Sequence, residues 1–207
     1  METLSLSEAG DRLKRGQIGV IPTDTLYGIV SSTCFPDSVE RVYQVRGRDA
    51  GKPCILLLSK KEEMEYFGVQ LSQSRARFLE ELWPGKVSIV FSDIPETFSF
   101  LHRGTGTLAF RVPESEPLRE LLSVSGPIIA PSANPQGAPS ARTVKEAENF
   151  FGSRVDWYVD GGVLSGKAST VVRWDKDALI LLREGAVTLP ERLLRTCLSS
   201  DIRSSRV

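Results

Sequence analysis

The stretch Pro127-Ile128-Ile129-Ala130-Pro131-Ser132-Ala133-Asn134-Pro135 joins an apolar run to a loop rich in proline. The run of residues 127–130 has the length and composition of a buried strand. Prolines at every fourth position beyond it fix φ, so the loop is stiff. Ser132, Asn134 and Ser140 carry hydrogen-bonding groups on this loop, which suits a polar or phosphorylated ligand. The alternative is that these groups only satisfy the backbone of a turn.

A second polar loop, Pro22-Thr23-Asp24-Thr25-Leu26-Tyr27-Gly28, follows an apolar strand predicted over residues 18–21. Its three small polar residues can orient a polar ligand, and Tyr27 can form a wall beside that ligand. The alternative is a plain capped turn.

The loop Arg46-Gly47-Arg48-Asp49-Ala50-Gly51-Lys52-Pro53 is the best candidate for an anion site in the sequence. An arginine offers a planar fork that matches phosphate or carboxylate, and glycine lets a ligand approach the backbone closely. The alternative is a solvated basic loop.

The periodicity of apolar residues predicts strands and helices that are mixed along the chain without strict alternation. Strands are expected over residues 18–21, 29–33, 54–58, 87–91, 107–112, 127–130, 155–159, 169–172 and 178–182. Helices are expected over residues 5–15, 36–45, 60–67, 71–83, 115–124, 143–151 and 190–198. Residues 92–105 are expected to form an irregular polar connection in which His102 and Arg103 are exposed.

These elements predict one α/β domain of α+β-like character over residues 1–207. The expected architecture is a twisted, mixed, open sheet with flanking helices. Residues 54–58 are almost continuously apolar, which places that strand near the centre of the sheet. Residues 199–207 are expected to be a flexible tail.

Composition excludes several classes of protein. The 26 basic and 26 acidic residues give a net charge of zero, which argues against a protein that coats nucleic acid with its whole surface. One histidine and three widely spaced cysteines make a zinc site or a disulfide framework improbable. No apolar run has the length of a membrane span or the position of a signal peptide, so a cytoplasmic protein without membrane contact is expected.

Polar or basic residues gather just beyond the ends of several predicted strands, where open α/β sheets collect their ligands. They are residues 23–25, 46–52 and 132–140, with Arg111, Ser169 and Arg183. Arg111 is the one charged residue of its apolar strand, so it either faces solvent at a sheet edge or points into a polar site. The sequence lacks a Ser-His-Asp set, a metal-binding cluster and a Walker loop. Arginines and hydroxyls without an obvious general base suit phosphate chemistry, which depends on positioning and charge neutralisation.

Six motifs in a fixed order carry a resemblance to a known family. They are Pro22-Thr23-Asp24-Thr25-Leu26-Tyr27-Gly28, Arg46-Gly47-Arg48 with Lys52-Pro53, Arg111-Val112-Pro113, Ala130-Pro131-Ser132-Ala133-Asn134, Ser169-Thr170-Val171-Val172 and Arg183-Glu184-Gly185. Over about residues 16–187 the chain resembles the YrdC/TsaC family, the L-threonylcarbamoyladenylate synthases. Each motif alone is unspecific, whereas six in order are specific.

The resemblance implies a YrdC-like fold, in which a single α/β domain surrounds a concave basic cavity. It implies a reaction that joins L-threonine, bicarbonate or CO₂, and ATP into threonylcarbamoyl-AMP and pyrophosphate. Partner proteins then transfer the threonylcarbamoyl group to the tRNA adenosine beside the anticodon; direct contact of this chain with tRNA is left open. Mg²⁺ is expected with ATP, held mainly by phosphates and water.

The same resemblance assigns roles to individual residues. Arg46 and Arg48 are the candidate catalytic residues. ATP is assigned to Arg48, Lys52, Thr107, Ser132, Asn134, Ser140 and Arg183. Threonine is assigned to Thr25, Arg111, Ala130 and Ser169, and no residue is assigned to a metal. The guanidinium of Arg111 can grip the α-carboxylate of threonine with two hydrogen bonds.

The sequence departs from the family pattern at two positions. The usual Lys-x-Arg is here Arg46-Gly47-Arg48, and because an arginine fork differs from a lysine point charge, the contacts to phosphate are expected to differ. Some members carry a histidine where this chain has Leu57, which affects the contacts to threonine.

Two other functions stay open. One is a divergent or non-catalytic paralogue that binds RNA or a nucleotide, which zero net charge and the lack of interleaved exposed aromatic residues disfavour. The other is carbamoyl adenylation, as in the related domain of the much longer hydrogenase-maturation proteins.

Overall fold

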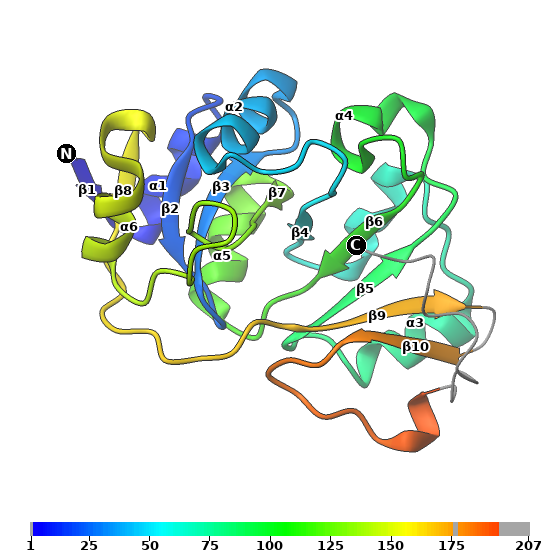
Figure 1. The fold of residues 1–207 in the computed structure, drawn as a ribbon. Helices are drawn as coiled ribbons and strands as arrows, with labels where there is room; N and C mark the ends of the chain where they lie inside the picture. Colours follow the sequence, from blue (N-terminus) through cyan, green and yellow to red (C-terminus); the bar gives the residue numbers. More distant parts are fainter. Residues whose placement is uncertain (1, 176–177, 195–207) are drawn as a thin grey trace.

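The computed structural model describes residues 2–175 and 178–194, which form one ten-stranded mixed sheet with flanking helices (Figure 1). The strands are β1 (Glu2–Leu4), β2 (Gly19–Pro22), β3 (Tyr27–Ser32), β4 (Ile55–Leu57), β5 (Val87–Phe91), β6 (Leu108–Arg111), β7 (Ile128–Ile129), β8 (Trp157–Val159), β9 (Thr170–Asp175) and β10 (Ala178–Arg183). The α-helices are α1 (Leu6–Leu13), α2 (Pro36–Arg46), α3 (Gln73–Glu80), α4 (Ser99–His102), α5 (Glu116–Ser125) and α6 (Val144–Phe151). The 3₁₀ helices are η1 (Lys61–Phe67), η2 (Glu96–Phe98), η3 (Gly152–Arg154) and η4 (Glu191–Leu193).

The strand order across the sheet is β1-β8-β2-β3-β7-β4-β6-β5-β9-β10. Parallel pairs such as β4–β6 and β5–β9 stand beside antiparallel pairs such as β2–β3 and β9–β10, which confirms the mixed sheet expected from the sequence. The two residues of β7 pair with β3 on one side and with β4 on the other, both antiparallel. The most apolar predicted strand, β4, therefore lies inside the sheet as expected.

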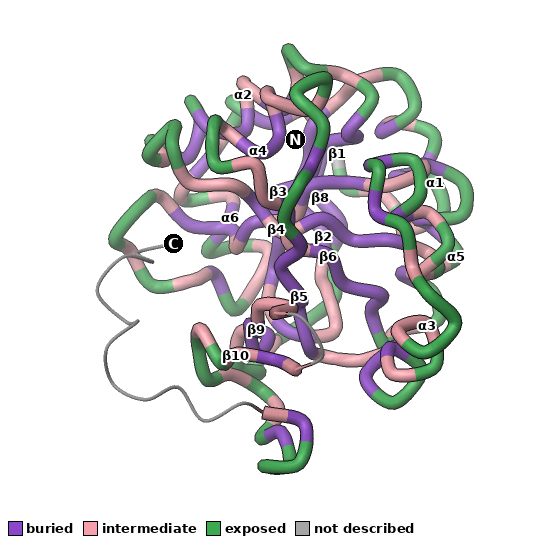
Figure 2. The backbone as a smooth tube through the Cα atoms, turned by 90° about the vertical axis from the view of Figure 1, so that its right-hand side faces the viewer, coloured by how far each residue is buried: buried purple, intermediate pink, exposed green. Residues whose placement is uncertain are grey.

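Both faces of the sheet centre are buried, which explains its unbroken apolar strands (Figure 2). Alternate residues of a strand point to opposite faces. Ile128 accordingly packs with α1 and α5, while Ile129 packs with the larger core that includes α2 and α6. The loops around this core are largely exposed (Figure 2).

Local signals explain why the helices begin and end where they do. Ser5 caps α1 and forms a capping box with Glu8. Pro36 occupies the first turn of α2, and Gly47 ends that helix with a φ of 58°. This sharp turn directs the chain from α2 into the basic loop.

Several sequence-based expectations were wrong. Residues 92–105 contain η2 and α4 rather than an irregular connection, whereas the helix expected over residues 60–67 is present as the 3₁₀ helix η1. His102 was expected to be exposed, yet 1% of it is accessible, because α4 folds it back into the protein. Strand β1 was not predicted. The predicted tail and residues 195–198 of the last predicted helix lie outside the described residues.

No helix in the described ranges has the length and apolar character needed to cross a membrane.

Candidate active site

A cavity of about 790 Å³, the large cavity, lies where the polar loops converge. Its walls are the β2–β3 turn, the α2–β4 loop, the loops before β6 and after β7, and parts of β9 and β10. Every residue that the sequence assigns to the site lines it: Thr25, Arg46, Arg48, Lys52, Thr107, Arg111, Ala130, Ser132, Asn134, Ser140, Ser169 and Arg183. The structure thus brings together residues from across the chain, while their individual roles stay predictions.

Cationic side chains dominate the charge of the large cavity. They are Arg46, Arg48, Lys52, Arg111, Arg173 and Arg183. No aspartate or glutamate of the described chain lines it; Asp24 pairs with Arg111, and Asp49 lies 3.9 Å from Lys52, without forming part of the wall. The cavity is therefore built to attract anions.

Arg46 and Arg48 are held in place by uncharged groups. Arg46 is 4% exposed; its Nε donates to the carbonyl of Asn134 at 3.0 Å, and its Nη2 donates to Ser132 Oγ at 3.4 Å. Arg48 donates to two backbone carbonyls of its own loop, at 3.1 and 2.9 Å. Carbonyl oxygens fix the geometry of a guanidinium without cancelling its charge, so both charges stay available to a ligand.

Burial and mutual repulsion disfavour the charged form of the arginines in the wall of the large cavity. Burial, with Arg48 as the next cause, lowers the pKa of Arg46 to about 10. Burial and then Arg48 also lower the pKa of Arg183. A bound anion would relieve this repulsion, because it favours the charged form of each neighbouring cation.

The proline-rich loop after β7 is closed by its own hydrogen bonds. The Nδ2 of Asn134 donates to the carbonyls of Pro135 and Ala138 at 2.9 and 2.8 Å, and its Oδ1 lies 3.4 Å from Ser140 Oγ. The side chain of Asn134 therefore satisfies the turn backbone, which was one of its two interpretations. Ser132 instead turns its hydroxyl toward Arg46.

Arg111 points into the polar site, so of its two interpretations the solvent-facing one is wrong. Its Nη1 lies 2.5 Å from Asp24 Oδ1, and each of the two side chains is 5% exposed. Its Nη2 lies 3.5 Å from Thr25 Oγ1, and the backbone N–H of Glu114 donates to Asp24 Oδ2 at 3.0 Å. Burial lowers the pKa of Arg111, although Asp24 opposes this effect. Sequence reasoning missed this role of Asp24, because its partner is 87 residues away.

Ser169, just before β9, is held by a second buried hydroxyl. Its Oγ lies 2.9 Å from Ser88 Oγ on β5, and its carbonyl accepts from Arg183 Nη2 at 2.9 Å. Gly185 is required beside it, because a Cβ there would lie 2.4 Å from the carbonyl oxygen of Ala168. Nothing in the local sequence pattern indicated Ser88.

Arg173 is a cavity residue that the sequence analysis did not assign. Ser169, Val171 and Arg173 all line the large cavity and alternate along β9. Since every second residue of a strand points to the same face, this spacing could have identified Arg173 once Ser169 was placed.

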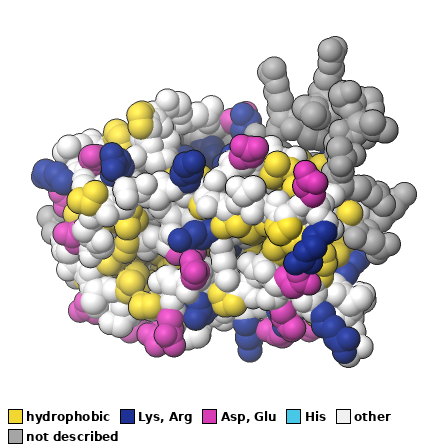
Figure 3. Space-filling view, turned by 90° about the horizontal axis from the view of Figure 1, so that it is seen from below, with side chains coloured by type: hydrophobic (Ala, Val, Ile, Leu, Met, Phe, Trp, Pro, Cys, Tyr) yellow, Lys and Arg dark blue, Asp and Glu magenta, His cyan; other side chains and the backbone are white. Residues whose placement is uncertain are grey.

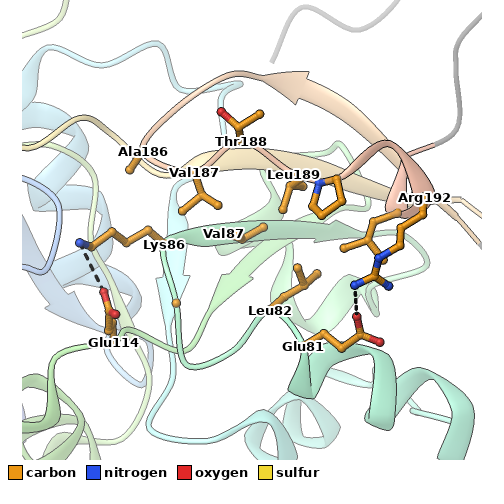
Figure 4. Close-up of a pocket in the computed structure, with 13 residues that line it drawn as sticks. Glu81, Leu82, Lys86, Val87, Glu114, Ala186, Val187, Thr188, Leu189 and Arg192 are labelled. Carbon is orange, nitrogen blue, oxygen red and sulfur yellow. Dashed lines mark hydrogen bonds and ion pairs between the residues drawn. The ribbon is translucent and has the colours of Figure 1, made fainter.

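A second, small cavity of about 350 Å³ lies between the residues that follow α3, the start of β5 and residues 186–193 (Figure 4). Its apolar lining includes Leu82, Val87, Val187 and Leu189. Lys86 Nζ lies 3.3 Å from Glu114 Oε2, and Arg192 Nη2 lies 3.1 Å from Glu81 Oε2 (Figure 4). Each cation of this wall is thus paired with a carboxylate.

The charges on one outer face of the molecule are mixed. The face in Figure 3 carries basic and acidic side chains interspersed, without a broad basic patch. In the part of the chain that the structure describes, no three His, Cys, Asp or Glu side chains cluster to hold a metal ion.

The structure is thus a mixed-sheet α/β domain with a basic cavity beside its strand ends, the place where open α/β sheets collect their ligands. The Sua5/YciO/YrdC family model, described as telomere recombination, matches residues 11–185, and the chain belongs to this family.

Curated relatives share about three residues in ten with this chain. The threonylcarbamoyl-AMP synthase of Pyrococcus abyssi is 29% identical over 194 residues, which cover 92% of this chain and 57% of that protein. That of Bacillus subtilis is 28% identical over 186 residues, which cover 88% and 54%. The chain thus spans about half the length of these two relatives. A threonylcarbamoyl-AMP synthase of Pseudomonas fluorescens Pf0-1, 28% identical over 165 residues, is covered to 87%.

Solved structures share the fold. P. abyssi Sua5 complexed with L-threonine matches with a TM-score of 0.77 and 28% identity, over 87% of this chain and 54% of that chain. E. coli YciO matches with a TM-score of 0.75 at 22% identity, over 87% of this chain and 88% of that chain. HypF in its phosphate- and nucleotide-bound form matches with a TM-score of 0.75 at 16% identity, over 89% of this chain and 29% of that chain. The last two establish likeness of fold alone.

Proposed function

We propose that this chain is a nucleotidyltransferase that makes threonylcarbamoyl-AMP and pyrophosphate from L-threonine, bicarbonate or CO₂, and ATP. Curated relatives over most of its length are threonylcarbamoyl-AMP synthases, and a related structure contains L-threonine. The observation that carries the proposal is the large cavity, whose wall holds six cations and no carboxylate among the described residues.

The basic loop supplies the proposed triphosphate end of the cavity. Arg46, Arg48 and Lys52 bring three positive charges from adjacent positions, and Arg183 approaches from β10. Burial and, after it, repulsion from Arg48 lower the pKa of Arg46 and of Arg183, and phosphate oxygens that enter would favour the charged form of both arginines.

The proposed amino-acid end contains Thr25, Arg111 and Ser169. Arg111 is anchored on one side by Asp24, which fixes the direction of its remaining donors. Such an anchored arginine suits the α-carboxylate of an amino acid, while the hydroxyls suit its polar groups.

The chemistry needs positioning more than proton transfer by the protein. The amine nitrogen of threonine forms a bond to the carbon of CO₂ and loses a proton, which gives a carbamate. A carbamate oxygen then attacks the α-phosphorus of ATP, the bond from that phosphorus to the bridging oxygen breaks, and pyrophosphate leaves. The wall cations hold the negative reactants together and stabilise the charge that develops on the leaving group.

Two further assignments belong to the same proposal. Mg²⁺ enters with ATP on its phosphates. The product is consumed by proteins that transfer the threonylcarbamoyl group to the tRNA adenosine beside the anticodon. Both follow from the reaction rather than from any residue of the wall.

The test is pyrophosphate release from ATP and bicarbonate with L-threonine, without it, and with L-serine as control. Release that requires L-threonine is expected. ATP binding without release in any mixture would favour the divergent nucleotide-binding paralogue, and absence of ATP binding would favour the RNA-binding one. Release that requires carbamoyl phosphate and ignores L-threonine would assign carbamoyl adenylation instead.

A further inference from the structure

The one histidine of the chain, His102, lies buried at the end of α4 and accepts two backbone hydrogen bonds. The N–H groups of Gly104 and Gly106 each donate to its Nδ1, at 3.2 Å in both cases. Because Nδ1 is the acceptor, the ring proton sits on Nε2. Nε2 lies 3.6 Å from Glu96 Oε2, beyond hydrogen-bond distance.

The turn that His102 holds has an unusual backbone. Arg103, Gly104 and Gly106 have φ values of 55°, 81° and 64°, in the left-handed region. A non-glycine residue such as Arg103 enters this region at an energetic cost, so the surrounding contacts must hold it there. The two bonds to Nδ1 are such contacts, since they fix two amides within a turn of five residues.

The same turn supplies hydroxyl groups to the large cavity. Thr105 and Thr107 both line it, and their Oγ1 atoms lie 3.0 Å apart. Thr105 Oγ1 donates to the carbonyl of His102 at 2.6 Å and accepts from the N–H of Thr107 at 3.2 Å. The position of both hydroxyls therefore depends on a backbone whose central acceptor is Nδ1 of His102.

We propose that His102 is a positioning residue of the site, whose Nδ1 holds residues 103–107 so that Thr105 and Thr107 present their hydroxyls to the ligand of the large cavity. The imidazole is buried and touches no ligand itself. The inference rests on the proposed function in one respect, namely that the ligand is ATP. It adds two residues, His102 and Thr105, to those that the sequence assigned.

Two substitutions separate this role from simple filling of space. Asparagine is smaller than histidine but places an acceptor, Oδ1, near the position of Nδ1. Leucine fills a similar volume without any acceptor. If His102 only packs the core, H102L is the better tolerated variant, because it leaves the smaller cavity. If His102 acts through Nδ1, H102N is the better tolerated one, because H102L leaves two buried amides without a partner.

The experiment measures ATP binding by calorimetry and amide hydrogen exchange by NMR on the wild type, H102N and H102L. H102L is expected to weaken ATP binding about tenfold and to speed exchange at Gly104 and Gly106 by a similar factor. H102N is expected to stay within about threefold of the wild type in both measurements. The control E96Q removes the carboxylate nearest to Nε2 and is expected to change neither quantity, since Nε2 holds no part of the turn.

The outcomes separate this inference from the proposed function. Equal ATP binding by H102L and the wild type, or better binding by H102L than by H102N, overturns the inference and leaves the proposed function intact. A wild type that binds no ATP overturns the proposed function. Exchange at the two glycine amides then still decides the role of His102: faster exchange in H102L than in H102N supports it, and equal exchange in the two variants overturns it.

Discussion

The small cavity and the large cavity neutralise their cations in different ways. In the small cavity Lys86 faces Glu114 and Arg192 faces Glu81, each within 3.3 Å. In the large cavity Arg46 and Arg48 face carbonyl and hydroxyl oxygens of the main chain and of Ser132. Carboxylates neutralise the cations in the wall of the small cavity, whereas the wall of the large cavity keeps a surplus of positive charge.

Because of this difference, we infer that the large cavity is the candidate site. Paired surface charges contribute about 0–1 kcal/mol to stability and leave nothing for a ligand to neutralise. Buried cations held by dipoles cost stability in the free protein, a cost that an anionic ligand removes. A surplus of charge that the fold itself does not need indicates function. The volumes of the two cavities alone would not distinguish a binding site from a structural cavity.

Removal of one unpaired cation gives the largest expected effect. R48A should weaken ATP binding about a hundredfold, because a charge-assisted contact to phosphate is lost. Titration calorimetry with ATP measures this. R192A, which removes an arginine from the small cavity, is the matched control and should change the affinity less than about twofold. Equal losses in both variants would remove the distinction between the cavities.

Asp24, the carboxylate that pairs with the buried Arg111, gives the next effect. D24N keeps the shape of the side chain but leaves Arg111 without its counter-charge, so the free energy of unfolding should fall by about 3 kcal/mol. The KM for L-threonine should rise about tenfold while the KM for ATP stays within about twofold, since Arg111 loses its fixed orientation. Denaturant unfolding and steady-state kinetics test the two parts separately. A rise in KM for ATP alone would place Arg111 at the nucleotide instead.

Substitution of Ser169 should have a smaller effect, which is confined to the use of L-threonine. S169A removes one neutral hydrogen-bonding group, so the KM for L-threonine should rise about fivefold with ATP binding nearly intact. S88A removes the hydroxyl that orients Ser169 without reaching the cavity and should show a weaker form of the same pattern. Equal loss of threonine and ATP binding in S169A would mean that Ser169 is wrongly assigned.

A substitution in the wall of the small cavity should have the smallest effect. E81Q breaks an ion pair whose side chains are 48% and 67% exposed, so the free energy of unfolding should change by less than about 1 kcal/mol. ATP binding and pyrophosphate release should be unaffected. A clear loss of activity would show that the small cavity takes part in the reaction, and would contradict the distinction between the two cavities.

The sequence predicted the parts of the site that depend on strand ends. Ser132, Arg48 and Ser169 lie in loops that follow or precede apolar runs, and a sheet brings such loops to one place. The apolar pattern and composition of the sequence also predicted the central position of β4 in the sheet, because a strand that is buried on both faces is apolar throughout.

The sequence could not predict pairings that exist only after folding. Asp24 and Arg111 meet across 87 residues, and Ser88 meets Ser169 across 81. His102 reads as a polar loop residue, but a turn of left-handed residues folds its ring inward to serve two amides. In each case the decisive partner is a tertiary neighbour, which local periodicity does not encode.

Strand β7 has a consequence for the order in which the chain can assemble. It stands between β3 and β4 in the sheet but follows β6 in the chain, so β3 and β4 cannot join one sheet until Ile128 and Ile129 have been synthesised. Strand β1 likewise waits for β8, whereas β5 can pair with β6 before β9 is synthesised. Domains of this kind close their long-range pairings slowly. The ribosome must therefore release most of the chain, up to the β10 residue Arg183, before the wall of the large cavity exists.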